Sequence, residues 1–221
     1  MKTVAAVHTG VIMVDLLKPL FAELLPGVRV INIVDDSIVA EAGRAGKITS
    51  AITKRLISYY FAGIDAGADV VFNTCSSVGE VADLGRQMLP VPLVKIDEPM
   101  AIKAVESASN IGVIATLPTT LGPTVRLVKT QAARLEKSVS VIEGLAEGAF
   151  QALIAGDPAT HDQMILDTAR RLAGDVDLFV LAQASMARME AAFSEATGKP
   201  VLSSPRLGTL AVKAILEGIN A

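Results

Sequence analysis

The chain has 221 residues, of which 51% are hydrophobic and 19% are charged, with a net charge of −3 and a mean hydropathy of +0.49. This length suffices for one large or two small α/β domains, and no apolar run reaches the roughly 18 to 20 residues that would span a bilayer. With no basic stripe, no Trp and only two Tyr, the composition argues against a nucleic-acid partner.

The single cysteine, Cys75, rules out an intramolecular disulfide, and the opening residues MKTVAAVHTG carry an apolar run that is too short for a secretory signal. We therefore expect a cytoplasmic protein that is not associated with a membrane. The apolar excess has to be buried in cores and suits burial in a subunit interface.

Short β-branched runs alternate with longer amphipathic stretches along the whole chain. The runs typical of strands are residues 4–8, 28–33, 69–73, 93–95, 110–115, 139–142, 177–181 and 200–202. The stretches typical of helices are residues 13–25, 47–66, 78–88, 99–107, 121–136, 145–172 with a break at Asp157-Pro158, 186–196 and 206–218. This alternation predicts an α/β fold of βα units around mainly parallel sheets, with four strands in each half.

One segment of the chain repeats another. Residues 68–77 (ADVVFNTCSS) align with residues 176–185 (VDLFVLAQAS), so that Asp69 and Asp177 are separated by 108 positions (177 − 69). The same separation relates residues 92–94 to 200–202 and residues 4–8 to 112–116. All α/β proteins are self-similar at this level, but three agreeing separations favour a true duplication.

The duplication predicts two similar lobes related by a pseudo-twofold, each a four-stranded mainly parallel sheet flanked by helices. We expect lobe 1 to comprise residues 1–97 plus 204–221, and lobe 2 to comprise residues 98–203. The final helix is assigned to lobe 1 because residues 200–202 lead the chain away from the second sheet.

Polar residues around Cys75 follow the third predicted strand. Ligands of open parallel sheets bind beyond the carboxyl ends of the strands, where loops present free N–H groups. Ser76 and Ser77 follow the cysteine, and Ser77 and Glu80 have the spacing of a capping box. A thiol before a helix N-terminus is expected to have a lowered pKa, which suits a nucleophile or a base. The alternative is that Cys75 is a small buried hydrophobe, which its polar neighbours argue against.

Small polar residues also follow the other predicted strands. These candidates for binding a carboxylate are His8, Thr9, Thr116, Thr119, Thr120, Gln183, Ala184 and Ser185. Thr119 and Thr120 are also placed to cap a helix from Leu121, and His8 is equally well explained as a core histidine. His161 is better explained by capping or exposure, and Arg188 and Arg206 by the surface. Without a glycine-rich nucleotide motif or a metal-binding set, we expect no cofactor and no metal.

Two of these segments resemble the aspartate/glutamate racemase superfamily, which includes hydantoin racemases, maleate isomerases and arylmalonate decarboxylases. They are Asn-Thr-Cys-Ser-Ser at 73–77 after Ala-Asp-Val-Val-Phe, and Ile-Gly-Val-Ile-Ala-Thr-x-x-Thr-Thr at 111–120. With the duplication, the resemblance covers nearly the whole chain. It implies an active site in the cleft between the lobes, where two cysteines, one per lobe, face the substrate's α-carbon. Cys75 is then the first, and Gln183 stands where the second occurs.

The resemblance implies proton transfer at the carbon next to the carboxylate of a small acid, by a racemase, epimerase or isomerase. It also implies that Thr9, Ser76, Thr116, Thr119 and Ser185 bind substrate oxygens. The resemblance further implies a homo-oligomer, either a dimer or a larger assembly, which the high apolar fraction supports. Because glutamine is neither an acid nor a base near neutral pH, a symmetric two-thiol reaction is in doubt. The alternatives are a single-cysteine decarboxylase of a malonate-like acid and a non-catalytic carboxylate-binding protein.

Overall fold

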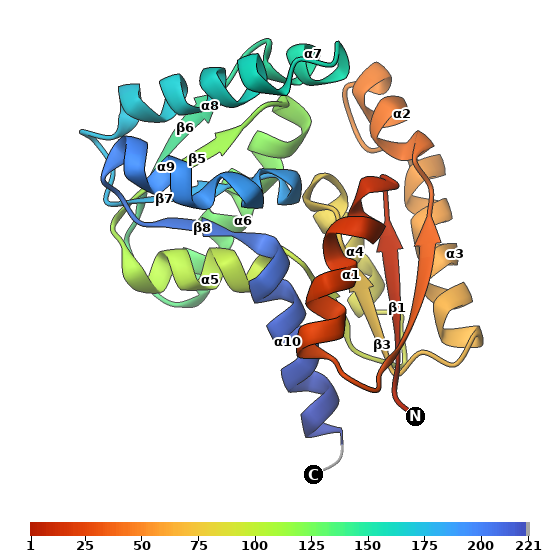
Figure 1. Ribbon diagram of the computed structural model, residues 1–221. Coiled ribbons are helices and arrows are strands. Elements are labelled where there is room, and N and C mark those ends of the chain that lie inside the picture. Colours follow the sequence, from red (N-terminus) through yellow and green to blue (C-terminus); the bar gives the residue numbers. More distant parts are fainter. Residues whose placement is uncertain (220–221) are drawn as a thin grey trace. The chain divides into compact units, whose positions relative to one another are not determined.

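The computed structural model describes residues 1–219, and the chain forms two compact units. The first comprises Met1–Pro99 together with the residues from Pro205 onward, and the second comprises Met100–Ser204. Each unit contains one four-stranded parallel sheet flanked by helices (Figure 1), which confirms the predicted fold class.

The sheet of the first unit has the strand order β2-β1-β3-β4. Its strands are β1 (Thr3–His8), β2 (Arg29–Val34), β3 (Val70–Asn73) and β4 (Leu93–Lys95). The central strands β1 and β3 are buried along their whole length, whereas β2 is partly exposed at the edge of the sheet. Their continuous hydrophobic runs follow from this burial, because helices cover both faces of a parallel sheet.

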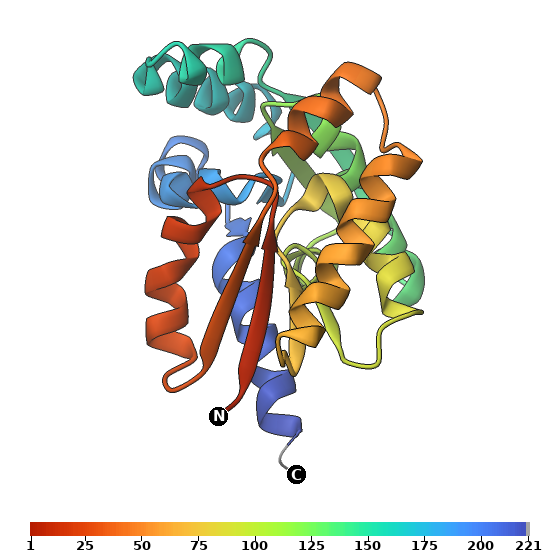
Figure 2. The ribbon, with the colours of Figure 1, turned by 90° about the vertical axis from the view of Figure 1, so that its right-hand side faces the viewer.

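Helices cover the first sheet on its two faces (Figure 2). On one face lie α1 (Ile12–Leu24) and α10 (Ser204–Gly218), and on the other lie α3 (Ser50–Asp65) and α4 (Gly79–Arg86). Phe21 of α1 packs edge-on against Phe72 of β3, with ring centroids 6.2 Å apart. The last helix is held by an ion pair between Arg206 and Glu23 of α1, and by Gly208, whose missing side chain lets the helix approach the backbone of Ile96.

The second unit repeats this arrangement with the strand order β6-β5-β7-β8. Its strands are β5 (Asn110–Ala115), β6 (Ser140–Leu145), β7 (Leu178–Leu181) and β8 (Val201–Ser203). Its helices are α5 (Glu98–Ser107), α6 (Pro118–Arg134), α7 (Ala149–Ile154), α8 (Pro158–Leu172) and α9 (Glu190–Thr197). Phe179 of β7 and Phe193 of α9 form an edge-on pair at 5.0 Å in the core between sheet and helices.

Strand pairing supports the duplication and corrects one of its predicted registers. The pairing of Val71 in β3 with Leu93 in β4 is equivalent to the pairing of Phe179 in β7 with Val201 in β8. These strands therefore correspond at the predicted separation of 108 positions. In contrast, the pairing of Val4 with Val70 is equivalent to the pairing of Ile111 with Leu178. The strands β1 and β5 therefore correspond at a separation of 107 positions (111 − 4). The prediction for residues 4–8 was therefore wrong by one position, which in a strand reverses the face on which a side chain lies.

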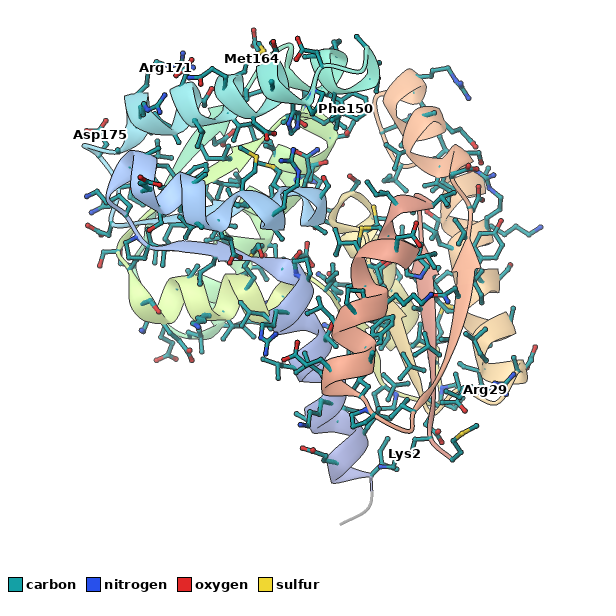
Figure 3. All side chains as sticks on the ribbon, in the orientation of Figure 1. Lys2, Arg29, Phe150, Met164, Arg171 and Asp175 are labelled. Carbon is teal, nitrogen blue, oxygen red and sulfur yellow. The ribbon has the colours of Figure 1, made fainter. Side chains whose placement is uncertain are left out.

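The corrected register is supported by a hydrogen bond that occurs at the equivalent position in each unit, where the strands of the sheet begin. The carboxylate of Asp69 accepts from the backbone N–H of Thr3 at 2.7 Å, and that of Asp177 accepts from the N–H of Asn110 at 2.8 Å. Lys2 and Arg29 lie at the same edge of the first sheet, where its strands begin (Figure 3). By this register, Thr9 at the opposite edge corresponds to Thr116, and Cys75 corresponds to Gln183.

The predicted helices differ from the observed ones in two places. Residues 37–45 form α2 (Ser37–Ala45), which the sequence analysis did not predict and which Gly46 ends with a left-handed φ of 66°. The predicted helix 186–196 begins instead as a 3-10 turn, Ala184–Met189, before α9. The break at Asp157-Pro158 is confirmed, since Asp157 caps α8 by accepting a hydrogen bond from the N–H of Thr160 at 3.0 Å.

Candidate active site

The carboxyl ends of β1 and β3 form the centre of the candidate site in the first unit. These neighbouring strands connect to helices on opposite faces of the sheet, α1 after β1 and α4 after β3. Such a switch point is where open α/β sheets bind ligands. Thr9 follows β1 and Cys75 follows β3, so the fold brings both predicted residues to this point.

Cys75 lies between β3 and a 3-10 turn, Ser76–Val78, that precedes α4. The residue is partly exposed, and its thiol accepts hydrogen bonds from the Thr9 hydroxyl and from the backbone N–H groups of Ser77 and Val78. Asn73 fixes the loop by donating from its Nδ2 to the Cys75 carbonyl oxygen at 3.0 Å. The sulfur therefore faces three donors that favour a negative charge.

Burial nevertheless raises the pKa of the Cys75 thiol, and this effect exceeds the lowering by the three donors. A nearby carboxylate, Asp97, raises the pKa further. The predicted lowering was wrong because burial of the thiol outweighs the donors around it, and because a 3-10 turn separates Cys75 from α4. The N-cap residue of α4 is Val78, whose apolar side chain cannot accept a hydrogen bond. Ser77 therefore does not occupy the capping position that the sequence suggested.

Gln183 occupies the equivalent position in the second unit. Its amide oxygen accepts from the backbone N–H of Thr116 at 2.7 Å, and its Nε2 lies 2.8 Å from the Thr116 hydroxyl. The Thr116–Gln183 pair thus corresponds to the Thr9–Cys75 pair of the first unit. Because the backbone donor fixes the position of the amide oxygen, the orientation of the amide is set, and its nitrogen offers N–H donors.

The family model for Asp/Glu/hydantoin racemases matches residues 5–212 of the chain. The chain belongs to this family. No curated protein matches it significantly in sequence. Among solved structures, it is similar to glutamate racemase from Francisella tularensis in complex with D-glutamate, at 14% identity and a TM-score of 0.76 over 99% of this chain and 82% of that one.

Two further structures extend this comparison. Allantoin racemase from Klebsiella pneumoniae is 13% identical with a TM-score of 0.72, over 98% of this chain and 88% of that one. An unliganded arylmalonate decarboxylase is 15% identical with a TM-score of 0.59, over 99% and 94%. At these identities the structures establish the fold, and the family match identifies the chain as a racemase-type enzyme.

In this racemase-family chain, His8 is fully buried at the end of β1. Its Nδ1 lies 2.8 Å from the Thr74 hydroxyl and its Nε2 lies 2.9 Å from Oδ1 of Asn32. Burial lowers the pKa of His8 despite the hydrogen bond to Asn32, so the imidazole is neutral at neutral pH. Both ring nitrogens are engaged within the first unit, and the side chain holds Thr74 next to Cys75.

The remaining predicted residues lie in the turns that follow these strands. Ser76 is buried and Ser77 partly exposed, both in the turn after Cys75. Ala184 and Ser185 are partly exposed in the turn after Gln183. α6 begins at Pro118 with Leu117 as its cap residue, so neither Thr119 nor Thr120 occupies the capping position expected of them. Each unit therefore gathers its own predicted residues at one sheet edge: Thr9, Cys75, Ser76 and Ser77 in the first, and Thr116, Thr119, Thr120, Gln183, Ala184 and Ser185 in the second.

A charged cluster beside Cys75 was missed by the sequence analysis. Lys95 and Asp97 are only 4% and 2% exposed, and the Lys95 ammonium contacts Asp83 at 2.8 Å. Gly79 leaves room for this lysine, because a Cβ there would lie 3.3 Å from Lys95 Cε. Charged residues at the end of the strand Leu93–Lys95 were the available signal, since buried charges need partners or a function.

Three other residues that the sequence analysis considered form ion pairs or polar contacts of their own. His161 is buried and its Nδ1 lies 2.7 Å from Oδ1 of Asp162, so the expectation of capping or exposure was wrong. Arg188 pairs with Asp162, and Arg206 pairs with Glu23. Both arginines lie at the protein surface, as predicted. Within residues 1–219, no group of three His, Cys, Asp or Glu is placed to hold a metal, and no helix is long and apolar enough to cross a membrane.

Proposed function

We propose that this chain is a cofactor-independent enzyme that transfers a proton at the carbon α to the carboxylate of a small acid, as a racemase, epimerase or isomerase. Cys75 is the reacting thiol. The observation that carries the proposal is the set of donors on its sulfur, the Thr9 hydroxyl and the N–H groups of Ser77 and Val78, at the switch point of a racemase-family fold. Donors arranged in this way stabilise the thiolate that forms when the proton leaves.

The chemistry requires one proton to move between sulfur and carbon. The Cys75 thiolate removes the α-proton, and the C–H electron pair is delocalised into the carboxylate as an enediolate. A proton then returns to the α-carbon, either from the Cys75 thiol on the same face or from solvent on the opposite face. Gln183 cannot carry the second proton, since an amide neither gains nor loses one near neutral pH. Inversion by this enzyme therefore uses solvent as the second proton source, and isomerisation needs the single thiol alone.

Substrate oxygens are proposed to bind the hydroxyl and backbone donors that the strand ends present. In the first unit these donors come from Thr9, Ser76 and Ser77. In the second they come from Thr116, Thr119, Thr120, Ser185 and the backbone of Ala184. Gln183 acts in this proposal as an amide donor, because Thr116 occupies its oxygen and leaves an N–H of Nε2 for a ligand oxygen.

A second candidate function is the decarboxylation of a malonate-like acid. It is favoured by one observation, namely that burial raises the pKa of the only thiol, so that Cys75 rests in the protonated form that a proton donor needs. The bond between the α-carbon and the departing carboxylate breaks, and its electron pair stays on the carbon. The Cys75 proton moves to that carbon, and water reprotonates the sulfur.

The test is an incubation in D₂O with chiral amino acids, hydantoins, hydroxy acids and substituted malonates. NMR follows deuterium at the α-carbon, and a coupled assay follows CO₂. Cys75→Ala removes the sulfur, and Cys75→Ser is the matched variant that keeps a hydroxyl for Thr9 but ionises far too weakly to act as the base.

The outcomes separate the candidates. Deuterium incorporation without CO₂, lost in both variants, supports the first proposal, whereas CO₂ release with deuterium incorporation supports decarboxylation. Turnover that survives in Cys75→Ala refutes both. Thermal stabilisation by a carboxylate in the wild type and in Cys75→Ala, with no turnover of any compound, supports the carboxylate-binding alternative.

A further inference from the structure

The helix α2 is attached to the first unit by few interactions. Two of its nine residues, Ile38 and Ala42, are buried. Its N-cap residue, Asp36, makes no capping hydrogen bond from its side chain to any described residue, and Gly43 lies inside the helix, where only proline is less favourable. A short segment with few buried apolar contacts opens at a lower free energy than the core of a protein. α2 therefore opens more easily than the sheet beside it.

The helix lies beyond the carboxyl ends of the strands of the first sheet, at the edge where the candidate site is (Figure 1 and Figure 2). The registers of β1 with β2 and with β3 place Asp35, Thr9 and Cys75 at the same level. The backbone N–H of Asp35 donates to the carbonyl oxygen of His8 at 3.0 Å, which extends the pairing past the end of β2. Neighbouring strands are about 4.8 Å apart, so Asp35 lies about 10 Å from Cys75 across the sheet.

The apolar face of α2 belongs to the same cluster of buried side chains as the turn after Cys75. Ile38 and Ala42 are members of this cluster, and so is Val78 of that turn. Cys75 packs against the cluster. Unfolding of α2 thus removes two side chains from the apolar surroundings of the thiol.

The guanidinium of Arg55 on α3 holds α2 and the residue before its N-cap. Its Nη1 donates to the Ser37 hydroxyl at 3.1 Å and lies 3.3 Å from Oδ2 of Asp35, and its Nη2 is paired with Glu41. The Asp35 carboxylate also accepts from the Tyr59 hydroxyl at 2.8 Å and from the Ser37 hydroxyl at 2.6 Å. One side chain of α3 thereby binds the end of β2, the first turn of α2 and the middle of α2.

We propose that α2 is a cover at the site edge of the first unit that opens by local unfolding, and that Arg55 is the positioning residue that latches it. The buried face and the Arg55 contacts favour the closed state, whereas Gly43 favours the open one. Opening widens the access of molecules to Cys75. The proposal rests on the proposed function only in taking Cys75 as the reacting thiol.

The experiment labels the full-length protein with two thiol reagents at pH 7.5, iodoacetamide and the bulkier fluorescein maleimide, and follows both by mass spectrometry. Cys75 is the only cysteine, so the label reports on this thiol alone. The measured quantity is the ratio of the maleimide rate to the iodoacetamide rate. A change in the pKa of the thiol alters both rates together, because both reagents need the thiolate, whereas a change in access alters the rate of the bulky reagent more.

Two variants move the cover in opposite directions. Arg55→Met removes the latch and should raise the ratio by about fivefold, which is the size that a partly exposed ion-pair network contributes. Lys54→Met is the matched control, because it removes a positive charge from the neighbouring, exposed position of α3, and it should keep the wild-type ratio. Gly43→Ala strengthens the helix, and no atom lies within 4 Å of the added Cβ, so the ratio should fall by about threefold.

Hydrogen exchange provides a second measurement on the same variants. The amides of residues 37–45 should exchange faster in Arg55→Met and more slowly in Gly43→Ala, while those of α3 keep their wild-type rates. A labelling ratio that stays at the wild-type value in either variant overturns the proposal. Circular dichroism checks that Arg55→Met is folded, and if it is not, Gly43→Ala decides alone, because a stabilising change keeps the fold.

The labelling needs no substrate, so its outcome is separate from that of the deuterium experiment. Ratios that move as expected in a protein that turns over none of the tested acids remove the proposed function and leave the cover standing. Unchanged ratios in an active enzyme remove only the cover.

Discussion

Replacing Thr9 by Val removes the side-chain hydrogen bond on the Cys75 sulfur while keeping the volume of the side chain. That bond lowers the pKa of the thiol, so its loss makes the thiolate form less readily. Hydrogen bonds to charged groups contribute about 1.5 to 3 kcal/mol, and partial exposure of Cys75 favours the lower end of this range. Thiolate formation, and with it the rate of alkylation at pH 8, should fall by about tenfold, since 1.4 kcal/mol is a factor of ten.

The duplication supplies the control for this experiment. Thr116→Val makes the same chemical change at the equivalent position of the second unit, where the hydroxyl contacts Gln183 instead of the thiol. Iodoacetamide labelling of this variant should follow the wild-type rate. If Thr9→Val labels as fast as Thr116→Val, the hydrogen bond does not stabilise the thiolate, and the arrangement of donors loses its proposed purpose.

Three further changes test other parts of the structure. The raised pKa of Cys75 stabilises the fold only below the thiol's unfolded pKa of about 8.5, so unfolding by urea should become easier above that pH in wild type but not in Cys75→Ala. Gln183→Glu keeps the acceptor for Thr116 and loses the amide donor, so KM for the substrate should rise several-fold while thermal stability stays within a few degrees, and an unchanged KM would show that the amide does not bind substrate. Gly208→Ala places a Cβ about 2.7 Å from the Ile96 carbonyl oxygen and should destabilise the protein by about 1 to 3 kcal/mol in urea unfolding; an unaltered midpoint would mean that α10 shifts at no cost.

The strands, and the gathering of the candidate residues at their carboxyl ends, were predictable from the sequence, because buried parallel strands leave uninterrupted apolar runs with polar residues at their ends. Each of the eight strands found within residues 1–219 lies where such a run occurs. α2 was missed because Ser37–Ala45 is short and contains Gly43, which weakens a helical pattern. The register of residues 4–8 was wrong by one residue, since a continuous apolar run fits either alignment and only strand pairing distinguishes them.

Electrostatic details of the site were not predictable. The direction of the Cys75 pKa shift depends on how deeply the sulfur is buried and on the 3-10 turn that separates it from α4, and neither leaves a pattern in the sequence. Asp97 is one of many acidic residues in the chain, and only its burial next to Ser76 distinguishes it. The local sequence thus identified which residues cluster, while their charge states follow from the packing around them.

The division of the chain also has a consequence for biosynthesis. The second unit is one continuous segment, Met100–Ser204, whereas the first unit is interrupted by it and regains the chain only from Pro205. A ribosome that releases the polypeptide from its N-terminus therefore completes the second unit before it has produced α10. Until then α1 alone covers one face of the first sheet, and the apolar surface that α10 will bury stays exposed on the nascent chain, where it is open to aggregation.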